Sequence, residues 1–154
     1  MNRARVAVTG AYITNGFVVG AFVARIPDFK EILKISNAQL GTAIFCSSIG
    51  LILGLAPTAR LCAKKGSAWV GFPSAIFLAL ATVLVGTSQT LLQLCLTLGI
   101  FGLCLGIQDV AMNAHAVAVE HVTKKRLMSS FHATFSAGAL IGGLTGGLLS
   151  QWNI

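Results

Sequence analysis

The sequence alternates between long apolar runs and short polar connections. Five runs are long enough to cross a bilayer as helices, which takes about 20 residues each. They cover residues 6–24, 40–59, 68–86, 91–119 and 128–150. Ser36-Asn37 supplies a helix N-cap before the second run. The pattern therefore predicts an all-α polytopic bundle of five transmembrane helices, in a single transmembrane domain over residues 1–154.

Composition supports the membrane assignment. Hydrophobic residues make up 55% of the chain and charged residues only 10%, and the mean hydropathy is +0.83. Too few charges are therefore present to coat a soluble globule of this size. A net charge of +7 would suggest nucleic acid in a soluble protein. Here the basic residues lie in short connections between apolar runs, which favours a role in membrane orientation over a nucleic-acid groove.

Lys and Arg residues are distributed unevenly between the two sides of the predicted membrane. If the N-terminus is inside, eight of the 11 face the cytoplasm: Arg3, Arg5, Arg60, Lys64, Lys65, Lys124, Lys125 and Arg126. The other three lie in the first loop, a predicted 15-residue connection over residues 25–39. Because cytoplasmic connections are enriched in Lys and Arg, this bias predicts that the N-terminus is inside and the C-terminus outside.

The fourth run carries the most informative pattern. At about 100° per residue, seven of its positions fall within an arc of about 100° and should face one partner or one cavity. They are Gly99, Gly102, Gly106, Asp109, Asn113, Ala116 and Glu120. An aspartate near the bilayer centre costs about 2.5–3.5 kcal/mol on insertion scales, so Asp109 is a candidate functional residue. It either handles substrate or a proton, or forms a structural polar clasp with Asn113 or a neighbouring helix.

Small residues mark the expected helix contacts. Gly138, Gly142 and Gly146 form two overlapping small-xxx-small steps in the fifth run, which is typical of close helix packing. The cysteines are spaced neither for disulfides nor for a metal, and we expect them to pack as small hydrophobes. They are Cys46, Cys62, Cys95 and Cys104.

The remaining polar residues predict no catalytic chemistry. Gln108 is expected to make a buried hydrogen bond, whereas Glu120 and His121 are expected to form a solvated charge group at a helix end. The histidines lack metal-ligand spacing, and neither a nucleophile motif nor a phosphate-binding loop is present. The sequence thus predicts a protein that is not an enzyme and that binds no metal or cofactor.

Four short segments carry a family resemblance. They are Asn15-Gly16, Arg25-Ile26-Pro27-Asp28 together with Leu40-Gly41, residues 59–67, and Asp109-Val110-Ala111-Met112-Asn113. Over nearly the whole chain, their order resembles the first five helices of a major facilitator superfamily permease, near the proton-coupled, fucose-type sugar branch.

Residues 59–67 resemble the cytoplasmic signature turn between helices two and three of that family. The positions that represent the turn here are Arg60, Lys64, Lys65 and Gly66, and Ala63 stands where the signature has aspartate. The resemblance implies that this segment lies at the cytoplasmic face, with a weaker charge network than the family usually has there.

The spacing Asp109-x-x-x-Asn113 resembles the acid-x-x-x-Asn element that sugar permeases carry in helix four. The resemblance implies that Asp109 couples transport to a proton and that Asn113 is its neighbour in the substrate site. In the first helix, Asn15 is the polar group nearest to the place of the second acid in the fucose-type pair.

These features together predict the N-terminal part of a secondary active transporter, a symporter in a bacterial cytoplasmic (inner) membrane. Its expected partners are a small polar, sugar-like solute, a proton and membrane lipid. Such transporters have two six-helix halves, each built from inverted three-helix repeats, so five helices predict a truncated permease that needs a missing half or self-association. The alternatives are a stand-alone oligomeric exporter or channel, and a non-transporting remnant or scaffold.

Overall fold

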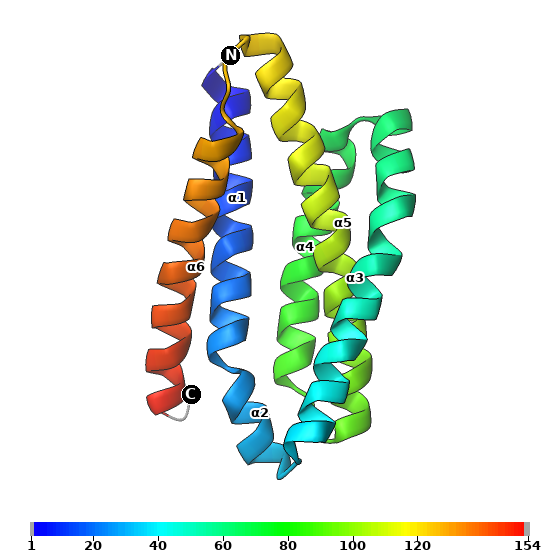
Figure 1. The fold of residues 1–154 in the computed structure, drawn as a ribbon, viewed down its shortest axis with the longest axis vertical. Helices are drawn as coiled ribbons and strands as arrows, with labels where there is room; N and C mark the ends of the chain where they lie inside the picture. Colours follow the sequence, from blue (N-terminus) through cyan, green and yellow to red (C-terminus); the bar gives the residue numbers. More distant parts are fainter. Residues whose placement is uncertain (1, 153–154) are drawn as a thin grey trace. The chain divides into compact units, whose positions relative to one another are not determined.

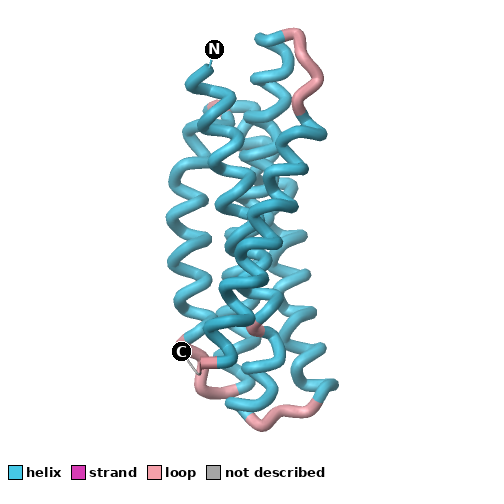
Figure 2. The backbone as a smooth tube through the Cα atoms, turned by 90° about the vertical axis from the view of Figure 1, so that its left-hand side faces the viewer, coloured by secondary structure: helices cyan, strands magenta, loops and turns pink. Residues whose placement is uncertain are grey.

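The computed structural model describes residues 2–152. Within this range the chain is helical and contains no strand (Figures 1 and 2). The helices are α1 (Asn2–Ala24), α2 (Ile26–Leu33), α3 (Asn37–Lys65), α4 (Ser67–Gly86), α5 (Leu91–Thr123) and α6 (Met128–Gln151). Five of these helices are long and apolar enough to cross a membrane, namely α1, α3, α4, α5 and α6. The predicted all-α bundle with five spans is confirmed.

Two helices continue past the apolar runs that predicted them. Helix α3 ends at Lys65 rather than at residue 59, so the predicted basic turn is the end of a helix. The connection to α4 is Gly66 alone, whose φ of 89° favours glycine. Helix α5 likewise continues from residue 119 to Thr123. Cations suit a helix C-terminus because they interact favourably with the helix dipole there.

The predicted first loop contains a short helix instead of an irregular connection. In α2, Ile26, Phe29 and Leu33 have the i, i+3, i+7 spacing of one helix face, and all three are half-buried. Asp28 lies in the first turn, where a negative charge stabilises the helix. The prediction of a plain loop was wrong because the high charge of this segment obscured its apolar spacing.

The predicted N-cap of the second span is confirmed. The Ser36 hydroxyl accepts a hydrogen bond from the Gln39 backbone N–H at 3.2 Å, and the Gln39 side chain accepts one from the Ser36 N–H at 2.8 Å. This reciprocal capping box satisfies two backbone donors that would otherwise be unpaired at the start of α3.

The chain forms two compact units, and α5 takes part in both. The terminal unit comprises Met1–Pro27 and Met112–Ile154, and the central unit comprises Asp28–Ala111. The terminal unit therefore contains α1, α6 and the C-terminal end of α5. The central unit contains most of α2, all of α3 and α4, and the first part of α5.

In the terminal unit, α1 and α6 pack backbone to backbone (Figure 1). A Cβ atom at Gly16 or Gly20 would overlap the backbone of Phe135 or Ala139. The contacts made by the α6 glycines are Gly138 with Ile13, Gly142 with Phe17 and Gly146 with Ala21. Residue numbers rise together along this α1–α6 seam, so the two helices run parallel. Close backbone contact maximises van der Waals packing, which drives helix association in lipid.

In the central unit, α3 and α5 form a second contact of the same kind. The pairs along this α3–α5 seam are Gly50 with Gly99, Gly54 with Leu103, Gly102 with Ser47 and Gly106 with Leu51. A Cβ atom at Gly50, Gly54, Gly102 or Gly106 would come closer to the facing backbone than real Cβ atoms do. These helices also run parallel, because the paired numbers rise together.

Helix α4 packs one face against α5. Its buried positions recur every three or four residues: Val70, Ser74, Leu78, Ala81 and Val85. The Ser74 hydroxyl donates a hydrogen bond to the side-chain oxygen of Gln108, which is 4% exposed. The predicted buried hydrogen bond of Gln108 is therefore confirmed, with Ser74 as its partner.

Candidate functional site

Tyr12 anchors a polar cluster in the terminal unit. Its side chain is fully buried, and its hydroxyl donates a hydrogen bond to Asn113 Oδ1 at 2.7 Å. The hydroxyl also lies 3.5 Å from Met128 Sδ. The Tyr12 ring stacks on Phe131 with centroids 5.5 Å apart, and its centroid lies 5.3 Å from that of His132 in an edge arrangement. Aromatic packing therefore holds the hydroxyl where it reaches across from α1 to α5.

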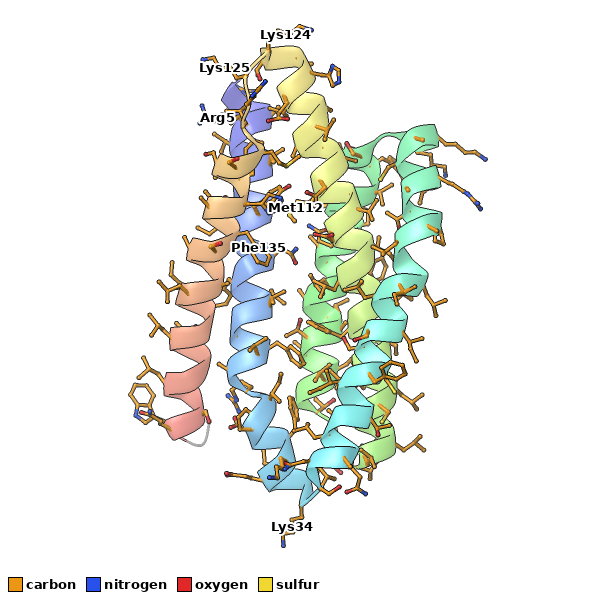
Figure 3. The ribbon with its side chains drawn as sticks, viewed as in Figure 1. Arg5, Lys34, Met112, Lys124, Lys125 and Phe135 are labelled. Atoms are coloured by element: carbon orange, nitrogen blue, oxygen red, sulfur yellow. The ribbon has the colours of Figure 1, made fainter. Side chains whose placement is uncertain are left out.

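Asn15 lies three residues after Tyr12, on the same side of α1. Its side chain is 3% exposed, and its amide nitrogen lies 4.0 Å from Met112 Sδ. Among the described residues, no group donates a hydrogen bond to the buried Asn15 Oδ1. An unsatisfied buried acceptor costs about 1–3 kcal/mol. Figure 3 shows Met112 between α5 and α1, on the side of α5 that faces this part of α1.

Asp109 and Asn113 lie on one helix but in different units. Asn113 is half-buried in the terminal unit, where Tyr12 binds it. Asp109 belongs to the central unit and its side chain is exposed in this chain. The structure thus joins Asn113 to α1, whereas Asp109 lies one helical turn earlier on α5 and belongs to the other unit.

The predicted seven-residue stripe on α5 meets two neighbours rather than one. Gly102 and Gly106 lie against α3, whereas Ala116 belongs to the core cluster of the terminal unit together with Tyr12. Of the two expectations, one partner or one cavity, a single partner does not describe the stripe, because α5 is longer than either contact. Its first half packs in one unit and its last turns pack in the other.

The signature segment lies at the end of α3. Arg60, Lys64 and Lys65 are exposed, and Gly66 separates α3 from α4. The Lys65 ammonium lies 4.4 Å from the ring centroid of Trp69 in α4, which is a cation–π contact. This contact links the end of α3 to the first turn of α4.

Glu120 has a more specific role than the solvated charge that was predicted. Its carboxylate accepts hydrogen bonds from the backbone N–H groups of Leu127 and Met128, the latter at 2.8 Å. The N-cap residue of α6, Leu127, has no side-chain cap of its own. Glu120 therefore caps α6 from the end of α5, where the helix dipole favours a negative charge.

Tyr12 and Met112 are cluster residues that the sequence analysis did not identify. The signal for Tyr12 is that it is the single tyrosine of the chain and lies inside an apolar run, because a buried tyrosine hydroxyl usually finds a hydrogen-bond partner. Within residues 2–152, no group of three His, Cys, Asp or Glu side chains is placed to hold a metal.

Comparison with known proteins identifies transporters. The sequence profile of the Major Facilitator Superfamily matches residues 8–154. An uncharacterized transporter of Sinorhizobium fredii is 30% identical over 90% of this chain and 37% of its own length. An uncharacterized MFS-type transporter of Yersinia pestis is 33% identical over 86% of this chain and 34% of its own length.

The membrane protein MosC of Rhizobium meliloti is 28% identical over 94% of this chain and 36% of its own length. No solved structure matches the sequence significantly. The chain thus spans about a third of the length of the curated relatives it matches. The family profile covers almost all of it, the helices have membrane length, and the chain therefore belongs to the Major Facilitator Superfamily.

Proposed function

We propose that this chain forms the N-terminal helices of a secondary transporter that moves a small polar, sugar-like solute across a bacterial cytoplasmic membrane, coupled to protons. Its family and its transporter-named relatives support a role in transport. The observation that carries the choice of solute is the buried, unpaired Asn15 Oδ1 beside the Tyr12–Asn113 hydrogen bond.

Asn15 is suited to recognise a hydroxyl group. The apolar surroundings make its unpaired oxygen a strong acceptor, because no water competes for it. A polyhydroxylated solute supplies O–H donors, and one of them would satisfy Asn15 Oδ1 in the bound state. The Tyr12–Asn113 bond holds α5 beside α1, so the acceptor is already in place when the solute arrives.

Asp109 is the proposed proton carrier. It is the single acidic residue within the apolar part of α5, since Glu120 lies at the helix end and caps α6. An intramembrane carboxylate is costly when charged, so its protonation state changes the free energy of helix movement in lipid. Asp109 lies one turn before Asn113 on α5, so the change acts on the same helix that Tyr12 binds.

Uptake by a chimeric transporter tests the proposal. This chain replaces the matching third of the Yersinia pestis transporter, and cells that produce the chimera are given radiolabelled sugars and sugar alcohols. We expect saturable uptake of at least one of them, and a loss of about tenfold for Asn15→Ala, which is the value of one hydrogen bond. Thr14→Ala, an exposed neighbour on α1, is the control. Unchanged uptake in Asn15→Ala, or no uptake of any polyol, contradicts the proposal.

The proposed orientation places the N-terminus in the cytoplasm. Arg5, Lys124 and Lys125 lie at the same end of the terminal unit (Figure 3), as the Lys and Arg bias requires. Single cysteines are introduced at Lys30 and at Lys64 in a cysteine-free chain. In intact cells, we expect an impermeant maleimide to label the cysteine at position 30 and to leave that at position 64 unlabelled. The reverse labelling pattern would exclude this orientation.

A further inference from the structure

Two of the four cysteines form a pair in the central unit. Cys46 lies in α3 and Cys95 in α5, and their side chains interact across the two helices. Both side chains are half-buried. The sequence gives no indication of this pair, because 48 residues separate the two positions and they meet only through the packing of their helices.

The α3–α5 seam explains why these thiols meet. Cys46 lies four residues before Gly50, and Cys95 lies four residues before Gly99. Since Gly50 and Gly99 touch and the helices run parallel, both cysteines lie one turn before that contact, at the same level. The carbonyl oxygen of Cys46 would lie 3.8 Å from a Cβ atom at Gly99, so the backbones are close at this level too.

Close backbones are what a disulfide requires. A disulfide spans Cα atoms about 4.4–6.8 Å apart, whereas ordinary packed helices have axes about 8–10 Å apart. Glycine contacts bring helices closer than ordinary packing does. Cys62 and Cys104 lie on the same two helices but at different levels, since Cys104 is opposite the residues near Gly54 and Cys62 lies two turns further along α3.

We infer that Cys46 and Cys95 are a redox modification site, which hydrogen peroxide converts into a disulfide that fastens α3 to α5. One cysteine, as its thiolate, attacks a peroxide oxygen, the O–O bond breaks, and the leaving hydroxide takes up the thiol proton, so that a sulfenic acid and one water form. The other thiol attacks the sulfenic sulfur, the S–S bond forms, the S–O bond breaks, and a second water leaves. The two sulfurs together lose two electrons, hydrogen peroxide gains them, and the thiol protons end in the waters. An external dithiol reverses the bond by exchange.

Crosslink mapping on the purified full chain tests this inference. The protein in detergent is treated with hydrogen peroxide, remaining thiols are alkylated, and peptides are analysed by mass spectrometry without reduction. We expect the intact chain to lose two hydrogen atoms before alkylation, and the Cys46–Cys95 peptide pair to dominate over every other cysteine pairing. Dithiothreitol should restore alkylation of both residues.

Matched variants separate proximity from general reactivity. Cys62→Ser/Cys104→Ser retains the pair and should form the intramolecular bond as the unaltered chain does. Cys46→Ser/Cys95→Ser retains the other two cysteines and should form none. A dominant crosslink other than Cys46–Cys95, or oxidation that yields only sulfinic and sulfonic acids, would overturn the inference. The mapping on the unaltered chain decides the question even if a variant fails to fold.

Discussion

The α1–α6 seam and the α3–α5 seam use the same packing but border different side chains. In both, glycines of the two helices bring parallel backbones into contact. One turn before Gly16 on α1 stands Tyr12, which binds Asn113, whereas one turn before Gly50 on α3 stands Cys46, which contacts Cys95. The comparison indicates that glycine spacing sets the geometry of each unit, and that residues one turn away determine what the geometry is used for.

The largest expected effect on stability is at the α1–α6 seam. Gly142→Leu would force the α6 backbone away from Phe17, and overpacking of this kind lowers the free energy of unfolding by about 3 kcal/mol. Thermal unfolding in detergent measures the loss. Gly147→Leu is the control, because a Cβ atom there meets nothing within 4 Å. Equal loss in both variants would show that helix propensity, and not the seam, is responsible.

At the α3–α5 seam we expect a somewhat smaller loss. Gly102→Leu would separate α5 from Ser47, but α4 still holds α5 through the Ser74–Gln108 hydrogen bond, so the expected loss is about 2 kcal/mol. The same unfolding measurement applies. Gly41→Leu on α3, where the space is open, should change stability little. If Gly102→Leu changes stability as little as Gly41→Leu does, the α3–α5 seam contributes less to stability than the α1–α6 seam.

Tyr12→Phe tests the hydrogen bond that borders the α1–α6 seam. The variant keeps the ring contacts with Phe131 and removes the hydrogen bond to Asn113, so it should lose about 1 kcal/mol. A double-mutant cycle with Asn113→Ala should give a coupling energy of about 0.6–1.7 kcal/mol. A cycle of Tyr12→Phe with Ser74→Ala should be additive, because the Tyr12 hydroxyl binds Asn113 and the Ser74 hydroxyl binds Gln108.

The smallest expected effect on stability belongs to Asp109→Asn. Because the side chain is exposed, we expect stability to change by less than about 0.5 kcal/mol. In the chimeric transporter, the same change should abolish accumulation driven by a proton gradient, since an amide cannot carry the proton. A lower melting temperature combined with normal accumulation would instead assign Asp109 to a structural clasp.

The spans could be predicted from the sequence, but the helix ends could not. Run length identifies spans because each must cross about 30 Å of hydrocarbon. The same criterion stops at the first cations, whereas α3 continues through Arg60 to Lys65 since charged side chains extend into water at no cost to the helix. Helix α2 was missed for a related reason: its charges outweighed the spacing of Ile26, Phe29 and Leu33.

For the candidate site, the sequence indicates residues but not their pairing. Asn113 and Asn15 stand out as polar groups in apolar runs, and the structure places both in the terminal unit. The bond from Tyr12 joins residues 101 positions apart and depends on how α1 packs against α5. The unpaired state of Asn15 Oδ1 is likewise a property of its neighbours, which no local pattern encodes.

The identity of the paired helices bears on the internal symmetry of the family. Each half of a transporter of this family nests two inverted three-helix repeats, so under the proposed N-terminal placement α1, α3 and α4 correspond to one repeat, and α5 and α6 begin the next. The α1–α6 seam then joins the first helix of one repeat to the second helix of the other, and the α3–α5 seam makes the reciprocal pairing. On that placement the glycines of the two seams serve one kind of contact that is made twice, once from each repeat.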